Sequence, residues 1–257
     1  FADVFGFRIA FFLSSITLFL AFFIALFWVK EDFSPQVAPG PPRIFRDMAH
    51  LIRENRILPF VALFALFALA RFSPRPMYPL LVKEIAAAGL GVATQAGLVN
   101  ATAGIAAVLA GIGVGRLADR GKPFVIGMFC AILAGVFLLP QGFMPTIWSL
   151  VPLVFFAGFF SAGIDPIMNI VLSRQVPVER RGTAFGLSGS ARAVGWSLGA
   201  MLGGILAAYL DFKAVFINAA VLFLIVAFLL SRLHRKSGAS GPDRSQGELR
   251  KGNTDRG

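Results

Sequence analysis

Charged side chains are scarce in this sequence, and their scarcity excludes a water-soluble domain. Asp, Glu, Lys and Arg make up 14% of the residues, whereas apolar residues make up 57%. A soluble domain carries about 25% charged residues, because its surface must face water. The mean hydropathy of +0.77 agrees with this deficit. We therefore expect a membrane protein.

Cysteine and histidine are nearly absent as well. The single cysteine, Cys130, excludes a disulfide framework and a cysteine-based metal cluster. The two histidines, His50 and His234, lie far apart in polar segments. An intramembrane enzyme needs a convergent nucleophile, base or metal ligands, and the apolar stretches contain no His and no Cys/His cluster. We predict no enzymatic activity, no metal site and no cofactor.

Seven apolar segments are long enough to cross a membrane as helices. A crossing of about 30 Å of hydrocarbon takes roughly 20 residues. Residues 123–164 carry no charge and are too long for one crossing, but Pro140 and Pro145 divide them. The expected fold class is all-α, a polytopic membrane protein, with spans at residues 6–29, 57–83, 93–116, 124–141, 147–173, 183–209 and 214–232.

The short charged segment at residues 115–123 sets the expected topology. It holds Arg116, Arg120 and Lys122 between two uncharged stretches, and short basic loops stay on the cytoplasmic side. Alternation from this point places 18 of the 24 basic residues on the cytoplasmic side and four on the other. Charge arranged in this way orients membrane helices and does not form a nucleic-acid surface. We expect a protein integral to the plasma or inner membrane, with a cytoplasmic C-terminus.

Changes in composition divide the chain into four parts. Phe1 lies directly before an apolar segment, without Met or a signal-peptide pattern, so we expect the sequence to be the C-terminal part of a longer protein. In the second part, residues 35–42 predict a stiff linker, and residues 43–56 predict a basic helix that lies either on the membrane surface or in solvent. The expected parts are a first helix (1–29), a cytoplasmic loop (30–56), a six-helix bundle (57–235) and a disordered tail (236–257).

Two charged loops and one glycine run resemble motifs of the major facilitator superfamily. Gly115–Lys122 resembles the signature Gly-x-Leu-Ala-Asp-Arg-x-Gly-Arg/Lys, although the residue before the second glycine is missing. Val178–Gly186 resembles the Glu-Arg-Arg-Gly-x-Ala-x-Gly entry into the family's fifth and eleventh helices. Gly195–Gly204 is similar to the Gly-x-x-x-Gly-Pro-x-x-Gly-Gly run of drug antiporters, with Ala200 in place of the proline.

The resemblance extends over nearly all of residues 1–236 and implies helices six to twelve of a twelve-helix transporter. Residues 1–29 would be the last helix of the N-terminal bundle, and residues 30–56 the loop between bundles. Drug:proton antiporters look closest among family members. This likeness implies a secondary active transporter that exports small organic molecules by alternating access, with a proton gradient as energy source. Its partners would be the lipid bilayer, a small-molecule substrate and the missing N-terminal helices of the same polypeptide.

Four polar residues inside the spans are candidate cavity residues, because charge in a membrane is unfavourable. At 1.5 Å per residue, Asp165 lies about 12 Å and Arg192 about 13 Å from the cytoplasmic ends of consecutive antiparallel helices. We expect an ion pair, either a static one or one that breaks when a proton or substrate binds. Asn169, one turn from Asp165, would complete its hydrogen bonds. Arg71, about 21 Å deep by the same rise, would receive an anionic substrate or pair with an acid in the missing bundle.

The helix that carries Arg71 is expected to be interrupted. Pro74, Pro76 and Pro79 follow Arg71, and broken helices at membrane depth are typical of a transporter's binding site. Trp196, in mid-span, either packs against a neighbour or offers an aromatic face to lipophilic or cationic compounds. An anionic substrate would indicate an importer or exchanger of a metabolite. A non-transporting membrane sensor or scaffold is the third hypothesis.

Two further groups of residues have expected structural roles. Gly195, Gly199 and Gly203, at four-residue spacing, predict close packing of a neighbouring helix. In the first charged loop, Asp119 would accept hydrogen bonds from a helix N-terminus of the partner bundle when the cytoplasmic side is closed. The alternative is that the two loops only orient the helices. The expected gating residues are Gly115, Asp119, Arg120, Lys122, Glu179, Arg180 and Arg181.

Overall fold

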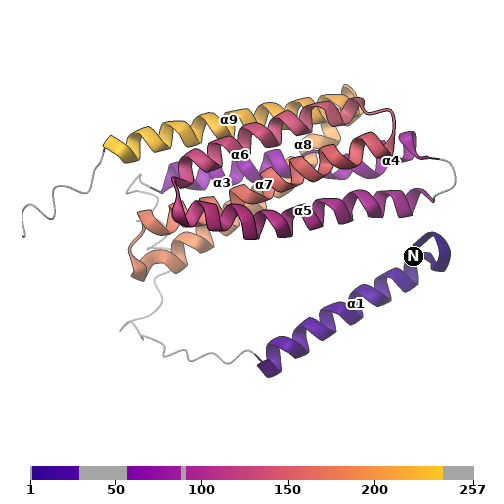
Figure 1. The fold of residues 1–257 in the computed structure, drawn as a ribbon, viewed down its shortest axis with the longest axis horizontal. Coiled ribbons are helices and arrows are strands. Elements are labelled where there is room, and N and C mark those ends of the chain that lie inside the picture. The colour runs from indigo at the N-terminus through magenta and orange to yellow at the C-terminus, as the bar shows by residue number, and fades with distance from the viewer. Residues whose placement is uncertain (1, 29–56, 88–90, 240–257) are drawn as a thin grey trace, which may run out of the picture.

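The structure is a computed structural model, and it describes residues 2–28, 57–87 and 91–239. Every regular element in these ranges is helical, and seven helical segments are long and apolar enough to cross a membrane (Figure 1). The predicted all-α fold with seven spans is therefore confirmed. The loop predicted at 30–56 and most of the predicted tail lie outside the described residues.

The helices agree with the predicted spans, but several have longer ends. The elements are α1 (Ala2–Trp28), α3 (Leu58–Phe72), η1 (Arg75–Met77), α4 (Tyr78–Ile85), α5 (Val92–Arg120), α6 (Pro123–Leu138), η2 (Leu139–Phe143), α7 (Ile147–Gln175), η3 (Val178–Arg180), α8 (Arg181–Tyr209) and α9 (Phe212–Ala239). The α5 helix runs through most of the first charged segment, so the turn to α6 consists of Gly121 and Lys122 alone. The α9 helix ends at Ala239, past the predicted start of the tail at residue 236.

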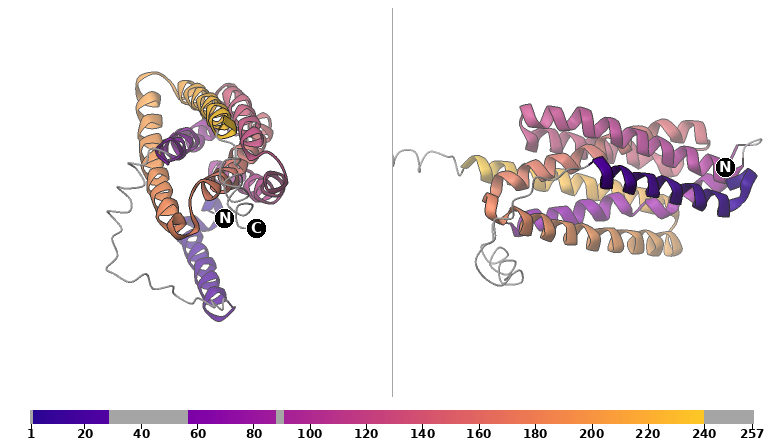
Figure 2. Two further views of the ribbon diagram at one scale, coloured as in Figure 1. Left: turned by 90° about the vertical axis from the view of Figure 1, so that its left-hand side faces the viewer. Right: turned by 90° about the horizontal axis from the view of Figure 1, so that it is seen from below.

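Six of the crossing segments form a bundle, and α1 lies apart from it, with a few contacts to α5 (Figure 1). Neighbouring helices in the bundle follow the order α8, α3, α9, α6, α7, α5, which makes an open arc (Figure 2). Because α5 and α8 lie at the two ends of this arc, they are the least buried helices of the bundle. Little of the described part of the chain covers the face between them.

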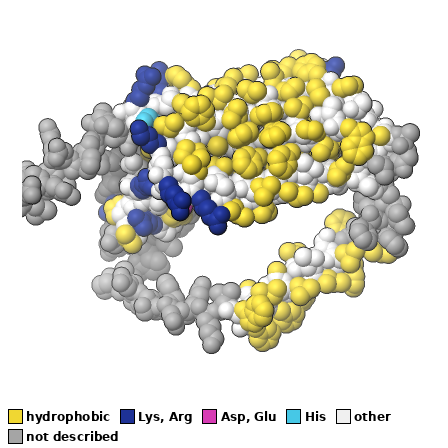
Figure 3. Space-filling model, viewed as in Figure 1, with side chains coloured by type: hydrophobic (Ala, Val, Ile, Leu, Met, Phe, Trp, Pro, Cys, Tyr) yellow, Lys and Arg dark blue, Asp and Glu magenta, His cyan; other side chains and the backbone are white. Residues whose placement is uncertain are grey.

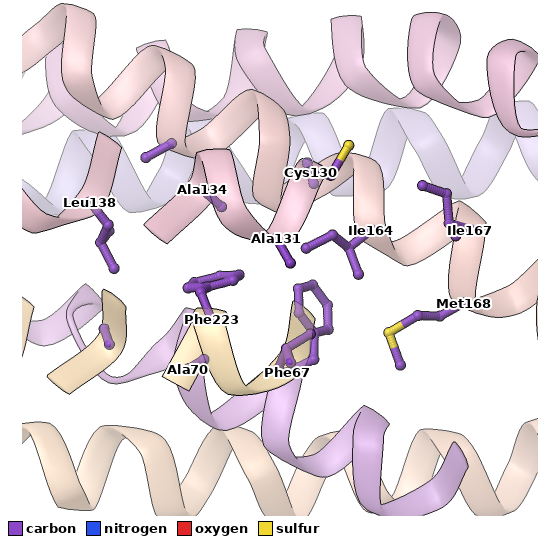
Figure 4. Close-up of a cluster of buried hydrophobic side chains, with 14 of the residues drawn as sticks. Phe67, Ala70, Cys130, Ala131, Ala134, Leu138, Ile164, Ile167, Met168 and Phe223 are labelled. Carbon is purple, nitrogen blue, oxygen red and sulfur yellow. The ribbon is translucent and has the colours of Figure 1, made fainter. Parts of the chain in front are cut away.

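Aromatic side chains from α3 and α9 fill the middle of the bundle. Phe67 and Phe223 meet edge to face, with ring centroids 6.1 Å apart (Figure 4). Ile164 of α7 and the small Ala131 and Ala134 of α6 are buried in the same cluster. In a membrane, lipid tails are as apolar as these side chains, so close van der Waals packing holds the helices together.

The two ends of the bundle differ in charge. We call the end with the α5–α6 turn, the α7–α8 connection and the last turn of α9 the hairpin end, and the other end the opposite end. Lys and Arg side chains gather at the hairpin end, whereas apolar side chains cover the face beside it (Figure 3). This distribution is the one that the predicted topology requires. Which side of the membrane the hairpin end faces remains a prediction.

A buried glutamine, Gln141, connects several helices at the opposite end of the bundle. At this end the prolines interrupt the segment from α3 to α4, as predicted. The α3 helix ends at Phe72, and η1 connects it to α4. The Tyr78 hydroxyl donates a hydrogen bond to Gln141 Oε1 at 2.7 Å. The Gln141 amide donates to the carbonyl oxygens of Phe137 and Leu153, both at 3.1 Å. Gln141 is fully buried and fully paired, and it joins α4, η2 and α7.

Candidate functional site

A glycine stripe on α8 packs directly on the backbone of α3, as predicted. A Cβ added at Gly199 would lie 2.6 Å from the carbonyl oxygen of Leu69 and 3.1 Å from its Cα. A Cβ at Gly195 or Gly203 would overlap α3 carbonyl oxygens one turn away on either side. The absence of side chains in this stripe therefore sets the distance between the two helices. It also determines how far the side chains of α8 reach across the bundle.

Arg192 lies one turn before the stripe, on the same face of α8. Its guanidinium carbon is 4.9 Å from the centre of the Phe64 ring of α3. Its Nη1 lies 3.4 Å from Asp165 Oδ1, so the predicted ion pair is present. Its Nη2 donates to Asn169 Oδ1 at 3.4 Å. The expectation that Asn169 bonds to Asp165 is wrong, because the guanidinium fork lies between the two side chains and binds both.

Arg71 of α3 binds the same carboxylate, through Nη1 and Asp165 Oδ2. In this structure the partner acid of Arg71 therefore lies in its own bundle, not in helices outside the chain. We call Arg71, Asp165 and Arg192 the charge cluster. The three side chains keep 19%, 30% and 22% of their surface exposed, so the cluster opens on one side. The Asp165 carboxylate pairs with two guanidinium groups, so the charge cluster carries a net positive charge.

A cavity of about 240 Å³ adjoins the cluster on the side of the opposite end. Arg71 lines it together with Arg75, Tyr78, Asn100 and Ser161, and the remaining wall is mostly apolar. No Asp or Glu is among the described residues that line it. Sites for drug-sized molecules usually measure about 300–1,000 Å³. The cavity has the composition of a ligand site but is small for a complete one.

Three contributors to this region were not predicted from the sequence. Phe64, below Arg192, is one of 28 phenylalanines, so its type gives no signal. Tyr78 lies between Pro76 and Pro79 and could be noticed only through its bond to Gln141. Asn100 did give a signal, since it is a polar side chain inside an apolar span.

Trp196 packs against α3 and also remains open to its surroundings. Its ring centroid lies 4.9 Å from that of Phe72, and 44% of the residue is exposed. The guanidinium of Arg75 also approaches Phe72, at 4.3 Å from the ring centre. The contact between Trp196 and Phe72 is the one that the packing interpretation of Trp196 expects. Its contact with a ligand stays a prediction.

The first group of predicted gating residues lies at the hairpin end of α5. Asp119 and Arg120 are exposed in the last turn of the helix, and Lys122 is exposed in the turn that follows. A Cβ added at Gly115 would meet nothing within 4 Å. The bundle itself therefore does not require a glycine at this position, and a gating role in contact with other helices stays a prediction.

The second group lies where α7 connects to α8. Glu179 and Arg180 belong to η3, and Arg181 begins α8. Arg180 and Arg181 are exposed at the hairpin end, and the Glu179 side chain is outside the described part of the structure. The predicted role of these residues in gating is untested as well.

Comparison with known protein families agrees with this architecture. Residues 1–149 and residues 93–253 match the family model described as Major Facilitator Superfamily. The chain belongs to this superfamily. The motifs in the two charged loops had indicated the same family, so that prediction is confirmed. Membership of a transporter family also supports the prediction that the chain is not an enzyme.

Curated relatives in the superfamily are named multidrug resistance protein MdtG. The protein from Salmonella heidelberg (strain SL476) is 27% identical over 236 residues, which are 91% of this chain and 58% of that protein. The protein from Enterobacter lignolyticus (strain SCF1) is 26% identical over 239 residues, 93% of this chain and 57% of that protein. The chain thus spans little more than half the length of the curated relatives it matches. This share agrees with the numbering of its seven spans as helices six to twelve.

Proposed function

We propose that the chain forms the C-terminal half of a secondary transporter that exports small organic molecules by alternating access. The observation that carries this proposal is the charge cluster, in which three charged residues from three helices meet within the membrane spans. Charged residues at such positions commonly mark substrate or ion pathways. The name of the relatives, multidrug resistance protein, supports drugs as the substrate class.

The open face of the bundle supports a site completed by further helices. Glycines on α5 (Gly104 and Gly111) and on α8 (Gly186 and Gly189) have open space where a Cβ would lie. Small residues on an exposed helix face let another helix approach closely. We infer that the N-terminal helices of the same polypeptide lie on this face. They would enlarge the small cavity beside Arg71 to the size of a drug site.

We infer proton coupling from the way in which Arg71 and Arg192 share Asp165. A proton on Asp165 would remove the negative charge that holds Arg71 and Arg192 near each other. The two guanidinium groups would then repel, and α3 and α8 would separate from α7. A ligand or proton that binds one arrangement better shifts the population toward it. In the same scheme, Asp119 and the neighbouring basic residues contact the partner bundle only when the hairpin end is closed.

The experiment replaces the shared carboxylate in the full product of the gene. Asp165→Asn keeps the side-chain volume but leaves both guanidinium groups without a counter-charge in the membrane. We expect export of a cationic dye from energised cells to fall about tenfold or more, because an unpaired buried charge is strongly unfavourable. Asp211→Asn is the matched control, since Asp211 lies between the spans of α8 and α9. It should keep the export rate of the unmodified protein.

Three outcomes separate the hypotheses. If the two variants are present in the membrane in equal amounts and export the dye equally, the charge cluster is not part of the transport pathway. Export that persists after a protonophore collapses the gradient would contradict proton coupling. If the unmodified protein, reconstituted in liposomes, moves neither cationic nor anionic dyes, the transport proposal is wrong and the sensor or scaffold hypothesis gains support.

An anionic substrate is the second candidate, because the site has an excess of positive charge. Two arginines of the cluster share one carboxylate, and Arg75 adds a third guanidinium to the wall of the cavity. A carboxylate or phosphonate on the substrate would balance this charge. Arg192→Gln distinguishes the candidates. If the substrate is anionic, this variant should no longer move an anionic dye but should still move a cationic one.

A further inference from the structure

A second pocket lies at the hairpin end, away from the charge cluster. Its volume is about 380 Å³, within the usual range of about 300–1,000 Å³ for small-molecule sites. The α5–α6 turn, the end of α7 and the end of α9 form its walls. We call it the hairpin-end pocket and define it by Lys122, Phe124, Val171, Arg174 and His234.

The hairpin-end pocket has basic groups from three separate elements. Lys122 comes from the turn, Arg174 from the last turn of α7 and His234 from the end of α9. All three side chains are exposed, so each can reach a bound group. No Asp or Glu is among the described residues that line the pocket. The site is therefore suited to a negatively charged ligand.

One wall of the same pocket is apolar. The rings of Phe124 and His234 lie with their centroids 5.6 Å apart. Val171, one turn before Arg174, is buried beside them. A ligand that fits this pocket combines an anionic group with a less polar part next to it.

The depth of the pocket in the membrane narrows the choice of ligand. The α7 helix has 29 residues and is therefore about 43 Å long. It exceeds the hydrocarbon thickness of about 30 Å, so we expect both of its ends, the last turn included, to reach the lipid headgroups. Arg174 is in that turn, and basic side chains gather at the same end of the molecule (Figure 3).

We propose that the hairpin-end pocket binds the phosphate headgroup of an anionic phospholipid. Lys122 and Arg174 bind the phosphate oxygens, His234 donates a further hydrogen bond, and Phe124 and Val171 contact the glycerol region. With the hairpin end in the cytoplasm, the lipid belongs to the inner leaflet, whose negative surface potential attracts basic groups. The inference depends on the position of the pocket and not on the transport proposal.

Native mass spectrometry of the chain in detergent tests the proposal. Phosphatidylglycerol and phosphatidylcholine with identical acyl chains are added in turn, and the lipid-bound fraction is measured. Lys122→Gln with Arg174→Gln should weaken phosphatidylglycerol binding roughly 30-fold, about fivefold for each basic residue removed. Arg232→Gln with Arg235→Gln is the matched control, because it removes the same charge at the same end outside the pocket. We expect this control to bind phosphatidylglycerol like the unmodified chain.

A second measurement does not depend on the loss variants. In Phe124→Trp, bromine-labelled phosphatidylglycerol should quench the new fluorescence more strongly than labelled phosphatidylcholine. Three results would overturn the proposal. If both double variants lose phosphatidylglycerol binding equally, the lipid is attracted to surface charge in general and not to the pocket. Equal quenching by the two lipids would show ordinary lipid contact. Displacement of the lipid by millimolar inorganic phosphate would show a site for soluble anions.

Discussion

Replacing Gly199 by alanine tests whether the contact between α3 and α8 positions the charge cluster. The new Cβ would lie 2.6 Å from the carbonyl oxygen of Leu69, whereas ordinary contacts begin at 3.4 Å. The α8 helix must therefore move away by about 0.8 Å, the difference between these two distances. Arg192, on the same face two turns earlier, would move with it from its partner Asp165, now 3.4 Å away.

The expected loss of stability can be estimated with a control on the same helix. Forcing a methyl group into a packed contact typically costs about 1–3 kcal/mol. Gly→Ala also favours the helix by about 1 kcal/mol, which offsets part of this loss. Gly204→Ala shares that gain but meets nothing within 4 Å. We therefore expect Gly199→Ala to be less stable than Gly204→Ala by about 1–3 kcal/mol, the cost of the overlap alone.

Titration of the purified chain with sodium dodecyl sulfate, followed by circular dichroism, measures this difference. Gly199→Ala should unfold at a lower detergent fraction than the unmodified chain, and Gly204→Ala at an equal or higher one. Identical midpoints for the two variants would refute the argument that backbone contact at the stripe fixes the helix distance. A loss in both variants would show that glycine is needed on α8 for another reason.

Two hydrogen-bonding residues at the opposite end give further predictions. Gln141→Leu leaves the Tyr78 hydroxyl without its acceptor, and should lower stability by about 1–3 kcal/mol in the same titration. Adding Tyr78→Phe should restore part of this loss, and a double variant no better than the single one would contradict the assignment. Gln95→Leu removes both hydrogen bonds to Ala87, at 3.0 and 2.9 Å, and should speed amide exchange at Ala87 by mass spectrometry. Asn100→Leu should leave that exchange unchanged, because the Asn100 amide donates within α5, to the Ala96 carbonyl oxygen.

The spans could be predicted from the sequence because the membrane imposes a simple rule. Every backbone polar group must be paired inside the hydrocarbon, so long apolar segments become helices and charged turns mark their ends. The exact ends were harder to predict. The residues from Gly115 to Arg120 form the last turns of α5, since charged side chains are compatible with a helix that projects into the headgroup region. Composition alone does not distinguish such a projecting helix from a loop.

The candidate site was predicted in part. The pairing of Arg71 with Asp165 was not predicted, and the reason is geometric. Asp165 and Arg192 were paired correctly because they lie at similar depth on consecutive antiparallel helices. Arg71 was placed about 21 Å deep, roughly 9 Å beyond Asp165, from the rise per residue. Side chains in a helix lean toward its N-terminus. Since α3 begins at the hairpin end and α7 at the opposite end, Arg71 and Asp165 lean toward each other and meet.

The same geometry bears on the proposed alternating access. Asp165 lies at nearly the depth of Arg192, whereas Arg71 approaches it from the opposite end. Displacement of α7 toward the opposite end would therefore favour the bond to Arg71 and stretch the bond to Arg192, which is already 3.4 Å long. Displacement toward the hairpin end would have the reverse effect. We infer that movement of α7 exchanges one arginine for the other, so that Asp165 keeps an arginine partner for as long as it carries its negative charge.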